Sequence, residues 1–189
     1  MTESAIPSAH NRMGAPSPWI ERFANLVPKD GTVLDLACGG GRHGRLFLSL
    51  GYSLVALDRN LSAVRDLADN PKVELIEADL EDGRAFPLAG RSFAAVVVAN
   101  YLYRPLLPAL VAAIARGGLL LYETFAQGNE RFGRPRNPDF LLARGELLEA
   151  VSGRLRVLAY EDLVVERPTP AAVQRIAARR EMETTEDAG

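Results

Sequence analysis

Three consecutive glycines, Gly39 to Gly41, are the feature of this sequence that says most about its fold. They follow an apolar run that starts at Val33, and they precede the polar segment Arg42-His43-Gly44. Glycine adopts positive φ without steric cost and lets the backbone approach a bound group closely. A helix that starts after the turn adds N–H groups without intrahelical partners. The sequence therefore predicts a strand, a tight nucleotide-binding turn and a helix in this order.

Short apolar runs and helical segments alternate along the rest of the chain. Apolar strands separated by helices are typical of a parallel sheet covered on both faces, and right-handed crossovers make such a sheet doubly wound. The last two strand-like runs are joined by residues 166–170 only, which predicts an antiparallel hairpin. We expect one Rossmann-like α/β domain whose mostly parallel sheet ends in this C-terminal hairpin. The expected strands are 32–37, 53–57, 73–78, 93–99, 119–123, 155–165 and 171–178, and the expected helices begin at Ser17, Arg42, Asn60, Pro105 and Gly145.

The chain of 189 residues has the length of a single domain with its own core. Residues 1–16 are rich in Ser, Ala, Pro and Gly without a period, and we expect a flexible N-terminal arm. Residues 17–180 form the expected domain. Residues 181–189 are polar and acidic, which predicts a disordered tail.

Composition excludes several classes of protein. No apolar run approaches the roughly 18–20 residues of a membrane helix, and the N-terminal residues lack the features of a secretory signal, so we expect a cytoplasmic protein without a membrane partner. Cys38 is the only cysteine, which excludes an internal disulfide and a multi-cysteine zinc site, and no metal is expected. The net charge of −2 argues against nucleic acid as a partner.

The glycine turn has two interpretations. Gly39 to Gly44 matches G-x-G-x-x-G, and Asp58 ends the second expected strand where an acid would hold ribose hydroxyls, as in an NAD-dependent enzyme. However, Asp35 precedes the turn and would repel a pyrophosphate but attract an ammonium group. Asp79 ends the third expected strand, from where it could accept a hydrogen bond from an adenine amino group. The C-terminal hairpin is not a second mononucleotide-binding half. A sulfonium cofactor with an amino-acid tail fits these acids better than two phosphates.

At these residues the chain resembles the class I S-adenosylmethionine-dependent methyltransferases. The segment Leu34-Asp35-Leu36-Ala37-Cys38-Gly39-Gly40-Gly41 is similar to their first motif, with Ala37 where the first glycine is usual. Gly117-Gly118-Leu119-Leu120 is similar to the start of their fifth strand, with Arg116 in place of a proline. The resemblance extends from about Trp19 to Arg180. Among subfamilies, the compact chain looks most like the small bacterial tellurite-resistance-type methyltransferases.

The resemblance implies a set of cofactor-binding residues. Asp35 would take the cofactor's ammonium group, Asp58 its ribose hydroxyls, and Asp79 and the following leucine its adenine. The alternatives are that Asp35 caps backbone N–H groups, that Asp58 caps the next helix, and that Asp79 belongs to a solvated acidic run. The full expected set is Asp35, Ala37, Cys38, Gly39, Gly41, Asp58, Arg59, Asp79, Leu80 and Asn100.

Three residues are candidates for the chemistry itself. His43 lies in the first turn after the glycines, where it could act as a general base or simply pack at the start of the helix. Tyr101 and Tyr103 follow the fourth expected strand, where they could line the acceptor pocket or pack beneath the next helix. A later loop holds three arginines that would attract an anionic acceptor, or that are simply solvated: Arg131, Arg134 and Arg136.

The expected function is methyl transfer from S-adenosylmethionine, with S-adenosylhomocysteine as the product, by in-line displacement onto an unidentified acceptor. The small size of the chain favours a small-molecule acceptor. Two alternatives stay open: an NAD(P)-dependent oxidoreductase that uses the same glycine loop, and a non-catalytic module that only binds the cofactor. The oligomeric state is left open by the sequence.

Overall fold

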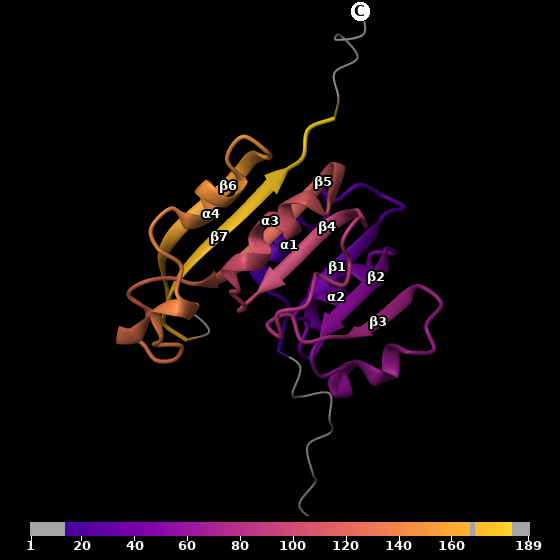
Figure 1. Cartoon of the computed structure of the whole chain (residues 1–189), viewed down its shortest axis with the longest axis horizontal. Coiled ribbons are helices and arrows are strands. Elements are labelled where there is room, and N and C mark those ends of the chain that lie inside the picture. The colour runs from indigo at the N-terminus through magenta and orange to yellow at the C-terminus, as the bar shows by residue number, and fades with distance from the viewer. Residues whose placement is uncertain (1–13, 167–168, 183–189) are drawn as a thin grey trace, which may run out of the picture.

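The computed structural model describes residues 14–166 and 169–182. It contains one sheet of seven strands in the order β3-β2-β1-β4-β5-β7-β6 (Figure 1). Strand β7 pairs antiparallel with both neighbours, while the remaining pairs of adjacent strands are parallel, which confirms the expected sheet and its C-terminal hairpin. The strands are β1 (Thr32–Leu36), β2 (Ser53–Asp58), β3 (Val73–Glu77), β4 (Phe93–Ala99), β5 (Ile114–Phe125), β6 (Arg156–Val165) and β7 (Ala171–Arg179).

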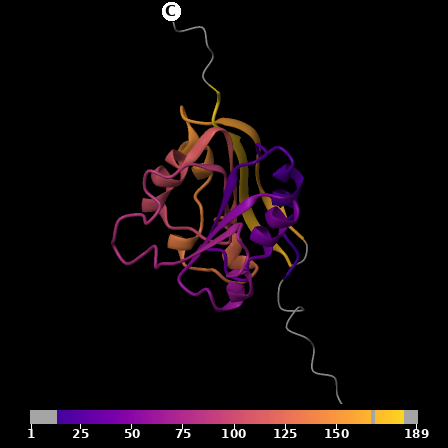
Figure 2. The ribbon, with the colours of Figure 1, turned by 90° about the vertical axis from the view of Figure 1, so that its right-hand side faces the viewer.

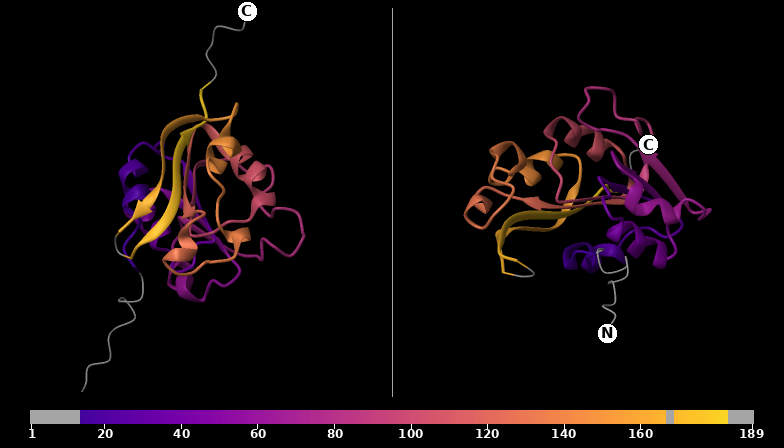
Figure 3. Two further views of the ribbon diagram at one scale, coloured as in Figure 1. Left: turned by 90° about the vertical axis from the view of Figure 1, so that its left-hand side faces the viewer. Right: turned by 90° about the horizontal axis from the view of Figure 1, so that it is seen from below.

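Helices cover both faces of the sheet, as Figures 2 and 3 show. Helices α1 (Pro18–Ala24) and α2 (Arg42–Ser49) pack on one face, where Trp19 and Phe47 join a core with residues of β1, β4 and β5. Helices α3 (Leu107–Ala112) and α4 (Glu146–Val151) cover the other face with a larger apolar core. Helix α1 starts as the sequence predicts, because the Ser17 side chain accepts a hydrogen bond from the Trp19 N–H and proline occupies the first turn.

The segment after β2 differs from the expected helix at Asn60. It forms the 3-10 helix η2 (Ser62–Leu67). Leu61, Val64 and Leu67 are buried and lie three residues apart, so three residues per turn place all of them against the sheet. The expected fifth strand also begins earlier, at Ile114, and includes the two glycines that were expected to precede it.

Parallel strands bring their carboxyl ends to one edge of the sheet. In Figure 1 this edge lies at the bottom, where the connections after β1, β2, β3, β4 and β5 gather. In open α/β sheets, ligands bind outside the carboxyl ends of the strands, so this edge is where a site is expected. The predicted arm and tail fall almost entirely on residues 1–13 and 183–189, outside the described part of the chain, and they stay predictions.

Candidate functional site

The glycine loop turns the chain sharply from β1 into α2. Ala37, Gly39 and Gly41 all adopt left-handed backbone conformations, with φ of +52°, +52° and +72°. A Cβ on Gly41 would lie 2.6 Å from Cγ1 of Val64, whereas a Cβ on Gly39 would have no atom within 4 Å. Gly39 therefore borders open space, while the buried Gly41 is required for the packing of the loop against η2.

Asp58 ties the glycine loop to the end of β2. Its Oδ2 accepts a hydrogen bond from the Gly39 N–H at 2.8 Å, and its Oδ1 accepts one from the Asn60 N–H at 3.0 Å. A carboxylate has about four lone-pair sites, so two sites are left for further donors. Asp58 does not cap η2, because the Ser62 N–H at the start of η2 donates to Oδ1 of Asn60 at 2.9 Å. The carboxylate of Asp58 therefore holds the glycine loop and leaves room for two ligand hydroxyls.

Asp35 lies beneath the loop and is only 2% exposed. Its Oδ2 accepts a hydrogen bond from the Gly44 N–H in the first turn of α2, at 2.8 Å. Burial raises the pKa of its carboxyl to about 7, although the Gly44 N–H and the charge of Arg42 act in the opposite direction. The capping role considered from the sequence is therefore present, and the expected contact with an ammonium group stays a prediction.

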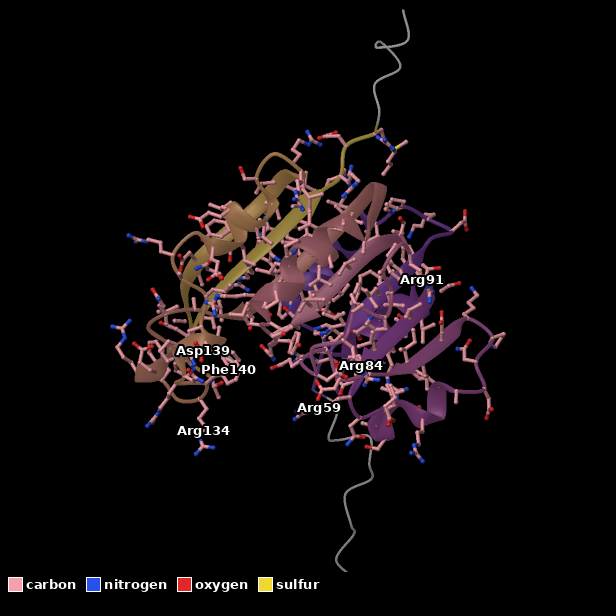
Figure 4. All side chains as sticks on the ribbon, in the orientation of Figure 1. Arg59, Arg84, Arg91, Arg134, Asp139 and Phe140 are labelled. Atoms are coloured by element: carbon pink, nitrogen blue, oxygen red, sulfur yellow. The ribbon has the colours of Figure 1, made fainter. Side chains whose placement is uncertain are left out.

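A cavity of about 340 Å³ opens between the segments that follow strands β1 to β5. Six of the predicted site residues line it, and three further residues, Ala78, Glu81 and Phe140, were not expected. Figure 4 shows Arg59 on the connection after β2 and Phe140 on the segment after β5. The lining residues are Ala37, Asp58, Arg59, Ala78, Asp79, Leu80, Glu81, Tyr101 and Phe140.

The sequence suggested that Tyr101 and Tyr103 could line one pocket, but in the structure they line two different cavities. Tyr101 lines the cavity with Asp58, whereas Tyr103 lines a second cavity of about 330 Å³. Asp79 and Leu80 line both cavities. Burial raises the pKa of the Tyr101 hydroxyl, and the nearby carboxylate of Glu81 raises it further. The Tyr101 hydroxyl has no well-aligned hydrogen-bond partner among the described residues.

The surroundings of His43 favour the packing alternative over the general-base interpretation. Its ring is 3% exposed, and its Nε2 accepts a hydrogen bond from the Ser17 N–H at 3.1 Å. Burial, and then the charge of Arg42, lower its pKa to about 4. The neutral ring therefore already uses its basic nitrogen to hold the start of α1, which is the packing alternative.

The remaining predicted residues lie around the same edge of the sheet. Asn100 follows β4 with a left-handed φ of +57°, and its N–H donates to the Glu123 carbonyl at 2.9 Å. Cys38 is buried, and burial raises the pKa of its thiol to about 12, so it stays protonated. None of the three arginines of the later loop lines the cavity beside Asp58. Arg131 and Arg136 instead donate hydrogen bonds to carbonyls of their own loop.

No group of three or more potential ligands that could hold a metal ion occurs among residues 14–166 and 169–182. Within the same residues, no helix has the length and apolar character needed to cross a membrane.

Residues 33–117 match the model of a protein family described as a methyltransferase domain. The match covers a little less than half of the chain, and it shows that this segment is similar to methyltransferase domains. It contains the glycine loop, Asp58, Asp79 and Asn100, so most of the predicted site belongs to the matched part of the chain. A comparison with curated proteins gives no significant match.

Solved methyltransferase structures share the fold of this segment and of the strands that follow it. TehB from Haemophilus influenzae aligns with a TM-score of 0.67 and 18% identity, over 86% of this chain and 61% of TehB, so the chain spans less than two thirds of that protein. A TehB-like S-adenosylmethionine-dependent methyltransferase from Corynebacterium glutamicum gives 0.60 and 16%, over 86% and 87%. The glycopeptide N-methyltransferase MtfA, solved with S-adenosylhomocysteine, gives 0.58 and 23%, over 86% and 88%. The resemblance to class I methyltransferases of the TehB type is confirmed by the family match and by the fold.

Proposed function

We propose that this chain is an S-adenosylmethionine-dependent methyltransferase that binds its cofactor in the cavity beside Asp58 and methylates a small molecule. The charge of the cavity carries the proposal. Asp58, Asp79 and Glu81 line it together with a single guanidinium, that of Arg59. An excess of carboxylates attracts a cofactor that carries a sulfonium and an ammonium group, and repels a pyrophosphate.

The residues of the cavity fit the parts of this cofactor. The two free lone-pair sites of Asp58 suit the two ribose hydroxyls, and such charge-assisted bonds contribute about 1.5–3 kcal/mol each. Asp79 and Leu80 lie on the connection after β3, where they would contact the adenine. Asp35, behind the glycine loop, would attract the ammonium group. That MtfA has been solved with both S-adenosylmethionine and S-adenosylhomocysteine supports the same choice of cofactor.

When bound, S-adenosylmethionine supplies an activated methyl group on its sulfonium. The protein then contributes mainly by positioning the two reactants in line and by excluding water. Asn100 and Tyr101, at the end of β4, would orient the reacting centre, while a general base is needed only for a weakly nucleophilic acceptor. His43 is not assigned that role. The cytoplasmic location expected from the sequence stays a prediction.

The oxidoreductase alternative is less well supported. A dinucleotide fold uses a second mononucleotide-binding half, but here antiparallel β7 lies between β5 and β6. A non-catalytic module would bind the cofactor in the same cavity and would differ from the proposed enzyme only in that it transfers no methyl group.

Transfer of a labelled methyl group tests the proposal. The purified chain is incubated with S-adenosylmethionine that carries a labelled methyl group and with a fractionated pool of cellular small molecules, and in parallel with cellular protein and with RNA. We expect label in a small-molecule fraction and an equal amount of S-adenosylhomocysteine. Label only in added protein or RNA would contradict the acceptor class. Tight cofactor binding without any transfer would favour the non-catalytic module.

A further inference from the structure

Residues 127–145, in the connection from β5 to α4, lie at the carboxyl edge of the sheet (Figure 1); we call them the cap segment. Its two ends are joined, because the Gln127 N–H donates to the Leu142 carbonyl and the Leu142 N–H donates to the Phe125 carbonyl, both at 3.0 Å. Its middle is anchored by Asn129, which is 1% exposed and whose side chain binds the Ala172 N–H and the Pro135 carbonyl. The cap segment is therefore held in place by hydrogen bonds at its ends and in its middle.

Phe140 is the residue of the cap segment that reaches the cavity. It ends the short 3-10 helix η5 (Pro138–Phe140), and the next two residues, Leu141 and Leu142, are buried at 3% and 0% exposure. Phe140 itself is 46% exposed and lines the same cavity as Asp58 and Asp79. A large aromatic ring that is left uncovered at a cavity offers a flat contact for a ligand.

Arg104 holds the backbone on both sides of Phe140. Its Nη1 donates to the Asp139 carbonyl at 2.7 Å, and its Nη2 donates to the Leu141 carbonyl at 2.8 Å. The same guanidinium forms a bidentate pair with Glu146 of α4, at 2.6 and 3.0 Å. A planar guanidinium with all these bonds has one orientation, so Arg104 fixes the position of Phe140 relative to the end of β4. Figure 4 shows Asp139 and Phe140 together on this segment.

We infer that Phe140 contacts the adenosine half of the cofactor and that Arg104 is the positioning residue that holds it there. The inference rests on the proposed function. The adenosine half is chosen because Phe140 shares its cavity with Asp58, Asp79 and Leu80, whereas Asp35 and Asn100 do not line it. Stacking of a base on an aromatic ring is a recurrent way to bind adenine without reading its hydrogen-bonding edge.

Calorimetry on the full-length chain with S-adenosylhomocysteine, and separately with adenosine, tests the inference. Phe140→Ala is expected to weaken both ligands by roughly tenfold, as for the loss of one base–aromatic contact, while Phe140→Tyr retains the ring and the affinity. Arg104→Gln is expected to weaken both ligands several-fold. The double variant should be no weaker than Phe140→Ala alone, because Arg104 acts through the ring.

Arg91→Gln is the matched control. Arg91 forms a similar bidentate pair with Glu74, at 2.9 and 2.7 Å, away from the cavity (Figure 4), so its loss should leave both affinities unchanged. Unchanged affinity in Phe140→Ala, a loss for S-adenosylhomocysteine but not adenosine, or additive losses in the double variant would each overturn the inference and leave the proposed function standing. Absence of S-adenosylhomocysteine binding by the unaltered chain would instead overturn the proposed function, and this inference with it.

Discussion

Asp58 shows how one side chain serves both the fold and the site. Its two oxygens accept the N–H groups of Gly39 and Asn60, so the carboxylate fixes the glycine loop against the end of β2. The same carboxylate lines the cavity. A substitution that removes it completely would disturb both functions, and a test has to separate them.

Asp58→Asn is expected to lower the affinity for S-adenosylhomocysteine by one to two orders of magnitude. The asparagine keeps an acceptor for only one of the two N–H groups, those of Gly39 and Asn60, and its neutral amide loses the charge-assisted bonds to the ribose hydroxyls. Calorimetry measures the affinity, and thermal unfolding without ligand should show a loss of stability of about 0.5–1.5 kcal/mol, as for one hydrogen bond. Asp66→Asn, at an exposed carboxylate paired with Arg45, is the control that should leave the affinity unchanged. Equal affinities for Asp58→Asn and the unaltered chain would remove the role assigned to Asp58.

Asp35 should make cofactor binding depend on pH. Burial raises the pKa of its carboxyl in the free protein to about 7, and a ligand ammonium group favours the ionised form. Affinity for S-adenosylhomocysteine should therefore rise as the pH increases from about 5 to 7, by at most about tenfold per unit, and level off above it. Below pH 7 binding should release a proton, which calorimetry in two buffers of different ionisation enthalpy detects.

Asp35→Asn should remove this pH dependence. The pKa of Asp35 in the folded chain lies above its ordinary value of 3.8, so its ionisation lowers the stability of the chain as the pH rises from about 3.8 to about 7. At pH 8 and without ligand, the variant should therefore resist urea at least as well as the unaltered chain, although it binds the ligand more weakly. A pH profile of binding that Asp35→Asn leaves unaltered would contradict this role.

Residues near the glycine loop were predictable from sequence because the loop, the acids at strand ends and the parallel sheet fix one another's positions. Six predicted residues line the cavity for this reason. Phe140 was not predictable, because its approach to Asp58 depends on the bonds from Arg104 to the Asp139 and Leu141 carbonyls. The contact of His43 with Ser17, 26 residues earlier in the sequence, was not predictable either, and it favours the packing alternative over the general base.

Among the elements, the glycine loop and η2 depend on each other. The loop packs against η2 only because Gly41 has no side chain: a Cβ there would lie 2.6 Å from Val64. The strands and α2 followed directly from apolar runs and glycine positions. The 3-10 form of η2 did not, because it depends on which face of residues 61–67 the sheet buries.

Gly41→Ala is expected to destabilise the chain by about 2–4 kcal/mol. About 1–2 kcal/mol comes from the left-handed conformation and the remainder from the overlap with Val64. Gly39→Ala is the matched control, with a similar φ but no atom near the new Cβ, so it should show only the conformational part. Urea unfolding without ligand measures both, and truncation by Val64→Ala should reduce the cost of Gly41→Ala. Equal losses for the two glycines would contradict the packing role of Gly41.

At the scale of the whole molecule, the order β3-β2-β1-β4-β5-β7-β6 determines which ligand the fold can hold. Five parallel strands bring the glycine loop, Asp58 and Asp79 to one edge, but antiparallel β7 stands where a second mononucleotide-binding half would need a parallel strand. The apolar runs predicted a mostly parallel, doubly wound sheet but not the order of its strands, and the short link before Ala171 predicted the hairpin. The position of the cap segment beside the cavity could not be predicted from the sequence, because the contacts that hold it join residues far apart in the chain.

Calorimetric titration of the unaltered chain with S-adenosylhomocysteine and, in parallel, with NAD shows which of the two cofactors the cavity binds. The acidic cavity and the single nucleotide-binding half predict binding of one S-adenosylhomocysteine per chain and no measurable binding of NAD under the same conditions. Tight binding of NAD without binding of S-adenosylhomocysteine would contradict the assignment of the cofactor and of the reaction.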